Sequence, residues 1–163
     1  MKSLFVYDIT HDSVVDGLGV RTVVWFSGCP NNCPGCHNKS IQDLYTGNLY
    51  DVDILAEELN KESKITFSGG DPLFQLEAFD DLLGLLKDSI DVWVYTGYSY
   101  KDTLEKISRM KNFHSRVSYI KVGPYIDSLK SMDCKFRGSS NQKIYKVVGN
   151  GLQDVSDEID RRD

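Results

Sequence analysis

The sequence predicts an α/β fold with a mainly parallel β-sheet, arranged either as an open sheet or as a partial β/α barrel. β-Rich runs alternate along the chain with amphipathic helical runs, which is typical of parallel strands joined by helices. The chain has 163 residues, so a single domain over residues 1–163 is the simplest organisation. A complete eight-stranded β/α barrel takes about 250 residues, and a closed barrel is therefore not expected.

The first half of the chain contains two predicted strands with a helix between them. Residues 21–26 form the first strand, which runs directly into a loop rich in cysteine, proline and glycine. The helix covers residues 51–60, with Asp51 as its N-cap and one apolar face made of Val52, Leu55, Ala56 and Leu59. The second strand covers residues 64–67, and the sequence Ser-Gly-Gly-Asp-Pro at 68–72 ends it.

The second half continues the alternation. The periodic spacing of Leu76, Phe79, Leu83 and Leu86 predicts a second helix. A third helix begins at Ser99, which has an acidic residue three positions on, as in a capping box. Strands are predicted at 92–95, 119–122 and 143–148. The last residues, 154–163, are strongly charged, and we expect this tail to be frayed.

Three cysteines lie close together in the loop after the first strand. Cys29, Cys33 and Cys36 have the spacing C-x3-C-x2-C, and the surrounding glycines and prolines favour a tight loop that gathers them around one point. Clustered thiolates bind soft metals or iron–sulfur clusters. Three protein ligands leave one position open for an outside molecule, which distinguishes catalytic metal sites from structural ones.

The same loop matches three weaker patterns. Cys33 and Cys36 resemble a thioredoxin-type redox pair, but that interpretation leaves Cys29 unexplained. With His37 they also fit the attachment pattern of a c-type haem, which usually accompanies export. A structural zinc site with Cys134 as the fourth ligand is the main alternative, although structural zinc ligands usually come as two pairs and Cys134 is solitary.

The predicted topology places several polar loops at one edge of the sheet. The cysteine loop, residues 69–72, and Thr96 with Gly97 each follow a predicted strand, and the carboxyl ends of parallel strands meet at one edge. Gly69 and Gly70 would let the backbone approach a ligand closely, and Asp71 could accept a hydrogen bond from an ammonium group. The plainer alternative is a strand-to-helix turn with Pro72 at the helix start.

Charge and hydropathy argue against two classes of partner. The net charge is −5 and no basic stripe is visible, so we expect no nucleic-acid partner. No segment approaches the roughly 20 apolar residues that span a bilayer, and the N-terminus is a poor signal peptide. We therefore expect a cytoplasmic location and no membrane partner, in a compartment where thiols stay reduced.

The cysteine spacing followed by Gly-Gly-Asp-Pro at 69–72 resembles the radical S-adenosylmethionine superfamily, whose members carry a similar Gly-Gly-Glu-Pro segment. Four further segments are similar to the anaerobic ribonucleotide reductase activating proteins: residues 16–21, 36–38, 93–98 and 136–142. The resemblance runs from about residue 16 to residue 148. It implies the open, partial β/α barrel of the radical S-adenosylmethionine type.

The resemblance also implies a set of cofactor ligands. Cys29, Cys33 and Cys36 would hold three irons of a 4Fe–4S cluster, and the open iron would chelate the amino and carboxylate groups of S-adenosylmethionine. The methionine end of that cofactor would be lined by Gly69, Gly70 and Asp71. Other cofactor-binding residues would be Gly35 and His37 through their backbone, Thr96, and Lys121, for which a solvated lysine at a strand end is an equal alternative.

The implied reaction is the reductive cleavage of S-adenosylmethionine and the abstraction of a hydrogen atom from a glycine of the partner. The implied partners are the catalytic subunit of anaerobic ribonucleotide reductase and a low-potential electron donor such as flavodoxin or ferredoxin. Two residues depart from the wider pattern: Asp71 replaces a glutamate, and Gly35 replaces an aromatic residue. Alternative functions are activation of another glycyl radical enzyme, a radical reaction on a small molecule, or a zinc-stabilised interaction module without catalysis.

Overall fold

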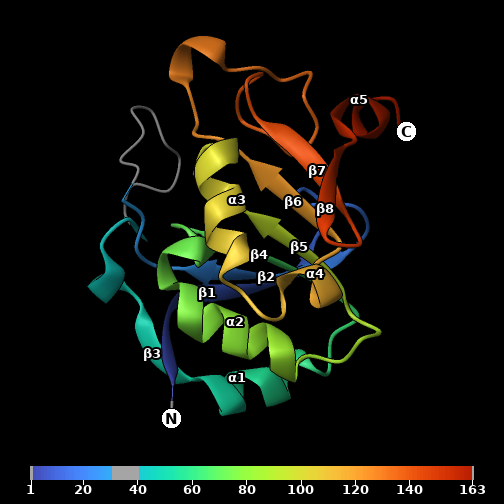
Figure 1. The fold of residues 1–163 in the computed structure, drawn as a ribbon. Helices are drawn as coiled ribbons and strands as arrows, with labels where there is room; N and C mark the ends of the chain where they lie inside the picture. Colours follow the sequence, from blue (N-terminus) through green and yellow to red (C-terminus); the bar gives the residue numbers. More distant parts are fainter. Residues whose placement is uncertain (1, 31–40, 163) are drawn as a thin grey trace.

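The computed structural model describes residues 2–30 and 41–162 of the chain. Cys33, Gly35, Cys36 and His37 therefore lie outside the described residues. The described residues form one sheet with the strand order β3-β1-β2-β4-β5-β6-β7-β8 (Figure 1). The strands are β1 (Ser3–Ser13), β2 (Arg21–Phe26), β3 (Asn48–Asp51), β4 (Lys64–Gly69), β5 (Asp91–Tyr95), β6 (Tyr119–Val122), β7 (Lys143–Val148) and β8 (Gly151–Asp154).

The described residues also form five α-helices and three short 3-10 turns, of which all but α5 lie between strands. The α-helices are α1 (Val52–Leu59), α2 (Leu76–Leu85), α3 (Tyr100–Ser108), α4 (Phe113–Arg116) and α5 (Ser156–Asp160), and the turns are η2 (Leu44–Thr46), η3 (Pro72–Gln75) and η4 (Asp127–Leu129). Two predicted caps are confirmed: Asp51 accepts hydrogen bonds at the start of α1 and Ser99 at the start of α3. No helix in the described part of the chain is long and apolar enough to cross a membrane.

The sheet is parallel only at its centre. β2, β4, β5 and β6 pair in parallel, as predicted. On one side β1 pairs antiparallel with β2 and with β3. On the other side β7 pairs antiparallel with β6 and with β8. The expectation of a mainly parallel sheet is therefore right for the four central strands, whereas the sheet as a whole is mixed. Its edge strands among the described residues are β3 and β8, which leaves the sheet open.

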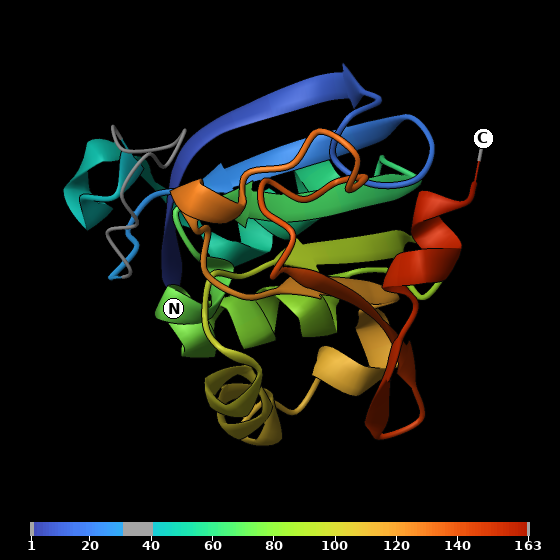
Figure 2. The same ribbon diagram turned by 90° about the horizontal axis from the view of Figure 1, so that it is seen from above.

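One face of the sheet carries the main hydrophobic core. Phe26 of β2 and Phe67 of β4 pack against Phe79 of α2, with ring centroids 5.0–5.8 Å apart. Buried residues of α1, α3 and α4 join the same cluster. Figure 2 shows α2 and α3 on one side of the sheet. The predicted apolar faces of the first two helices thus fix the four central strands.

The opposite face is covered by aromatic residues and by the end of the chain. Trp93 and Tyr95 of β5 form a second cluster with Ile144, Val155 and Ile159. We expect a frayed tail at 154–163 from the sequence, but residues 156–160 form α5 and Ile159 is fully buried. Val155 and Ile159 are four residues apart and so lie on the same face of the helix, which the high charge of the tail obscures.

β1 was not predicted either. Leu4 and Val6 are fully buried and alternate with exposed or half-buried neighbours, which is the pattern of a half-buried strand. The alternation stops after Val6, and the strand has register shifts between Val6 and Asp8 and between Thr10 and Ser13. β1 is therefore fixed as a strand by its pairing with β2, and not by the alternation of its own residues.

Arg21 ties three strands together at the edge of the sheet where β2 and β5 begin. Its Nε donates to Thr66 Oγ1 at 2.8 Å, and its Nη1 donates to Asp91 Oδ2 and to the Leu18 carbonyl, each at 2.7 Å. Its Nη2 donates to the carbonyls of Ile65 and Asp91. The side chain is fully buried, so these acceptors replace water around a charged group.

We expect Arg21→Lys to lower the free energy of unfolding by about 3 kcal/mol, because an ammonium group cannot replace the planar guanidinium and its five donors. Urea unfolding measures the effect. Arg116→Lys is the matched control: Arg116 pairs with the exposed Asp88 and should change stability by about 1 kcal/mol or less. Equal effects at the two positions would contradict the role given to Arg21.

Candidate functional site

The candidate site lies at the carboxyl ends of β2, β4, β5 and β6, which we call the rim. Cys29 follows β2 closely and is half-buried. Its backbone N–H donates to the carbonyl of Gln42 at 2.9 Å, and the N–H of Gly28 donates to that of Ile41 at 2.8 Å. The chain thus returns to the rim at residues 41–42. Both ends of the cysteine-bearing segment are anchored at the same place.

Gly69 and Gly70 lie directly against the start of that segment. The N–H of Gly70 donates to the carbonyl of Phe26 at 2.7 Å, and the N–H of Asp71 donates to that of Gly28 at 2.8 Å. A Cβ at Gly69 would lie 2.3 Å from the Phe26 oxygen, and a Cβ at Gly70 2.4 Å from the Gly28 oxygen. Larger residues would therefore separate the loop after β4 from Cys29. The two glycines allow close contact between two backbone segments, and the close approach to a ligand stays a prediction.

The carboxylate of Asp71 connects this loop to the end of β5. The side chain is fully buried (0% exposed). Thr96 Oγ1 donates to both carboxylate oxygens, at 3.0 and 2.9 Å, and the N–H of Gly97 donates to Oδ2 at 2.8 Å. The N–H of Leu73 donates to Oδ1 at 3.0 Å, so Asp71 also caps η3. The strand-to-helix turn that begins at Pro72 is therefore present as well.

This geometry bears on the role expected for Asp71. Four hydrogen bonds from within the chain reach a carboxylate that water does not reach. In this arrangement Asp71 joins the loop after β4 to the end of β5, and its expected role as an acceptor for an outside ammonium group stays a prediction. Burial raises the pKa of Asp71 from 3.8 to about 6, against the opposing effects of the hydrogen bonds from Gly97, Leu73 and Thr96 and the charge of Lys121.

Lys121 belongs to the same rim. Its carbonyl accepts a hydrogen bond from the N–H of Thr96 at 2.9 Å, and its ammonium nitrogen lies 4.7 Å from the ring centroid of Tyr95. The charge of Lys121 lowers the pKa of Asp71, which places the two groups within electrostatic range. A lysine held over an aromatic ring is more restricted in orientation than one at a free strand end.

Tyr98 is a rim residue that the sequence analysis did not single out. Its N–H donates to Thr96 Oγ1 at 3.2 Å. The pKa of Tyr98 is raised to about 12, first by burial and then by the charges of Asp71 and Cys29. The phenol therefore lies near both groups. The signal that could have identified it is its place at the end of the segment 93–98.

The described residues contain one of the three expected metal ligands. No group of three histidine, cysteine or acidic side chains that could hold a metal occurs within residues 2–30 and 41–162. Cys29 is a half-buried thiol close to the backbone of Gly70 and Asp71, and its role as a cluster ligand stays a prediction. The roles of Cys33, Cys36, Gly35 and His37 stay predictions.

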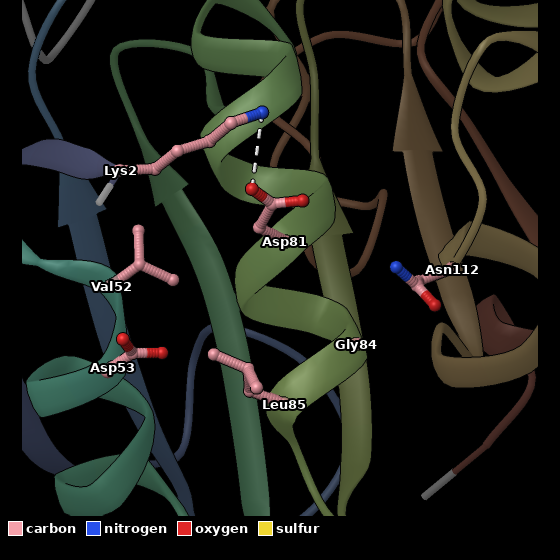
Figure 3. A pocket seen from close by; sticks show the side chains of 7 residues that line it. All are labelled: Lys2, Val52, Asp53, Asp81, Gly84, Leu85 and Asn112. Atoms are coloured by element: carbon pink, nitrogen blue, oxygen red, sulfur yellow. Dashed lines mark ion pairs between the residues drawn. The ribbon is translucent and has the colours of Figure 1, made fainter.

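A surface hollow on the helical side of the sheet is a different feature. It is lined by Lys2, Val52, Asp53, Asp81, Gly84, Leu85 and Asn112 (Figure 3). Lys2 and Asp81 form an ion pair of 3.2 Å, and about half of each side chain is exposed. Exposed ion pairs of this kind contribute little binding energy. The hollow contains none of the predicted site residues and lies over α2 rather than at the rim.

Comparisons with known proteins support the iron–sulfur interpretation of the rim. A family model described as a 4Fe-4S single cluster domain matches residues 15–145. A chain of QueE from Escherichia coli has a similar fold, with a TM-score of 0.55 and 13% sequence identity. That match covers 77% of this chain and 61% of QueE, and at this identity it carries information on the fold alone.

Three relatives are similar over most of their length, and each is named an anaerobic ribonucleoside-triphosphate reductase-activating protein. The protein from Escherichia coli strain K12 is 30% identical over 147 residues, which cover 82% of this chain and 93% of the relative. The protein of Enterobacteria phage T4 is 30% identical, with 80% and 86% covered. The Haemophilus influenzae protein is 31% identical, with 82% and 92% covered. The chain therefore belongs to the family of anaerobic ribonucleoside-triphosphate reductase-activating proteins and contains its 4Fe–4S domain.

Proposed function

We propose that this chain generates a glycyl radical on an anaerobic ribonucleoside-triphosphate reductase, and that the rim is where it does so. The observation that carries the proposal is the convergence of Cys29, the Gly69–Gly70 backbone and Thr96 around the buried carboxylate of Asp71. Membership of the activating-protein family supports the reaction, and the match to a 4Fe–4S domain supports the cofactor.

The cysteines would hold the cluster. Cys29, Cys33 and Cys36 would supply three thiolates and leave one position of the cluster for the amino and carboxylate groups of S-adenosylmethionine. When bound, the cluster and this cofactor would supply the one-electron radical chemistry that removes a hydrogen atom from a glycine Cα. The chain itself contributes position and the exclusion of water.

The residues around Asp71 would position the methionine end of the cofactor. The backbone of Gly69 and Gly70 faces the start of the cysteine segment, and Lys121 brings a positive charge to the same rim. We assign Asp71 and Thr96 to the support of this surface, because their side chains bond to each other. Gly35 and His37 would contact the adenosine through their backbone.

The open sheet fits a protein substrate. We propose that it is the partial β/α barrel of the radical S-adenosylmethionine type, with the rim at the carboxyl end of β6 accessible to the glycine-bearing chain of the reductase catalytic subunit. A low-potential donor of the flavodoxin or ferredoxin kind would supply the electron. The net charge of −5 agrees with a cytoplasmic protein that binds neither nucleic acid nor membrane.

We expect Cys33→Ala to leave the fold largely intact and to abolish the reductive cleavage of S-adenosylmethionine, because the cluster loses one of three ligands. Iron and sulfide content after anaerobic reconstitution and the formation of 5′-deoxyadenosine measure the effect. Cys134→Ala is the control and should keep both. A Cys33→Ala variant that forms 5′-deoxyadenosine at the normal rate, or a wild type that holds zinc in place of iron, would contradict the ligand assignment.

We expect Thr96→Val to lower the free energy of unfolding by about 2 kcal/mol and to slow the cleavage of S-adenosylmethionine, because the buried carboxylate of Asp71 loses the hydroxyl that donates to it. Urea unfolding and initial rates of 5′-deoxyadenosine formation measure the two effects. Thr96→Ser keeps the hydroxyl and should retain most of both. A Thr96→Ser variant as impaired as Thr96→Val would mean that the methyl group, not the hydrogen bond, matters.

The raised pKa of Asp71 predicts a pH dependence of stability. Between its unfolded value of 3.8 and its folded value of about 6, the folded state binds more protons than the unfolded state. The contribution of Asp71 to stability is therefore highest below pH 4 and falls as the pH rises to 6. We expect the stability of the wild type relative to Asp71→Asn to decrease between pH 4 and pH 6 in urea unfolding. A pH-independent difference would contradict the shift.

A further inference from the structure

The segment between β6 and β7 leaves the sheet at the rim. It starts at Gly123, two residues after Lys121, and its end at residues 136–142 is one of the stretches that resemble the activating proteins. In Figure 1 the segment rises beyond the arrowhead of β6 and carries η4 as the orange turn at the top. The support of the cofactor described above uses none of its side chains.

Hydrogen bonds from two buried side chains fix the base of this segment. Gln142 Oε1 accepts from the N–H groups of Gly138 and Ser139, at 2.8 and 3.3 Å. Its Nε2 donates to the carbonyl of Gly123 at 3.0 Å, which joins the end of the segment to its beginning. Ser139 Oγ accepts from the N–H of Ile126 at 3.2 Å. The two arms of the segment are therefore held side by side.

The segment is also attached to the body of the protein. The guanidinium of Arg137 pairs with Asp160 of α5, and the N–H of Lys135 donates to the same carboxylate at 3.0 Å. The ring of Phe136 meets Trp93 edge-on, with centroids 5.6 Å apart. Phe136 has a φ of 61°, a strained value for a phenylalanine that persists only where the surroundings fix it. The segment is thus a rigid projection.

The tip of this projection carries exposed apolar side chains. Ile126, Leu129 and Met132 are 38%, 40% and 91% exposed. Ile126 directly precedes η4 and Leu129 is its last residue, so the two exposed side chains lie at the two ends of one short turn. Opposite charges on Asp127 and Lys130 leave the tip without a strong field of one sign. Contiguous exposed apolar surface marks interaction sites, and these three side chains on one short segment are our candidate for such a surface.

We propose that Ile126, Leu129 and Met132 form a docking surface for the glycine-bearing chain of the reductase, an inference that rests on the proposed function. The reaction needs a protein backbone to reach the rim, so the substrate must cover the structure around it. The segment leaves the sheet two residues after Lys121, close to the rim that this backbone has to reach. A tip that is held by hydrogen bonds within its own segment suits a protein partner, because little loop entropy is lost on binding.

The test uses the reconstituted holoenzyme and the purified catalytic subunit of the reductase. Met132→Glu should bind the reductase at least about tenfold more weakly than the wild type in anaerobic biolayer interferometry, while 5′-deoxyadenosine formation without the reductase stays at the wild-type rate. Met132→Gln should cause a smaller loss in the same direction. Met132 is almost fully exposed, so the fold should tolerate both changes, which circular dichroism checks.

Val148→Glu is the matched control. Val148 is 52% exposed and follows the part of β7 that pairs with the beginning of β6, away from the rim. The Val148→Glu variant should bind the reductase as the wild type does. Unchanged binding of Met132→Glu, or equal loss in both Glu variants, would overturn the proposal. A Met132→Glu variant that binds the reductase normally but is no longer reduced by flavodoxin would also overturn it. The same holds if the only effect of Met132→Glu is a change of the protein from dimer to monomer.

Failure of the docking proposal and failure of the proposed function have different signatures. A wild-type holoenzyme that never cleaves S-adenosylmethionine removes the function itself. If the wild type and the Met132→Glu variant both cleave S-adenosylmethionine and bind the reductase equally well, only the docking surface is overturned.

Discussion

The buried carboxylate of Asp71 is the interaction on which the arrangement of the rim depends. A carboxylate without access to water is stable only where donors surround it, and here the donors come from the turn after β4 and from the end of β5. The backbone N–H of the same residue reaches the carbonyl before Cys29. One residue thus connects the ends of three neighbouring parallel strands, and the glycines before it allow the contact.

The sheet topology explains why the rim lies at one edge of the sheet. Four parallel strands bring their carboxyl ends to one edge, and the antiparallel strands β7 and β8 end the sheet without closing it. The helices and the phenylalanine cluster stabilise one face. The other face is filled by Trp93, Tyr95 and α5, and from it the rigid 123–142 segment extends past the rim. We propose that support for the cofactor and contact with a protein substrate belong to different parts of one edge.

Much of this arrangement follows from local sequence. The caps at Asp51 and Ser99, the central parallel strands and the approach of Gly69 and Gly70 to the rim are consequences of short patterns. The partners of Asp71 are not, because Thr96 lies 25 residues further along the chain and the bond depends on strand pairing. β1 and α5 escaped prediction because their few buried residues gain their partners from distant strands. Tyr98 is assigned to the rim only once Thr96 and Asp71 are placed.

The most direct test of the account combines the reduced holoenzyme, S-adenosylmethionine and the reductase catalytic subunit under anaerobic conditions, followed by electron paramagnetic resonance. The account predicts a glycyl radical signal on the reductase that requires all three components and appears together with 5′-deoxyadenosine. Formation of 5′-deoxyadenosine at a normal rate without any glycyl radical on the reductase, or a sample that holds no iron–sulfur cluster, would contradict it.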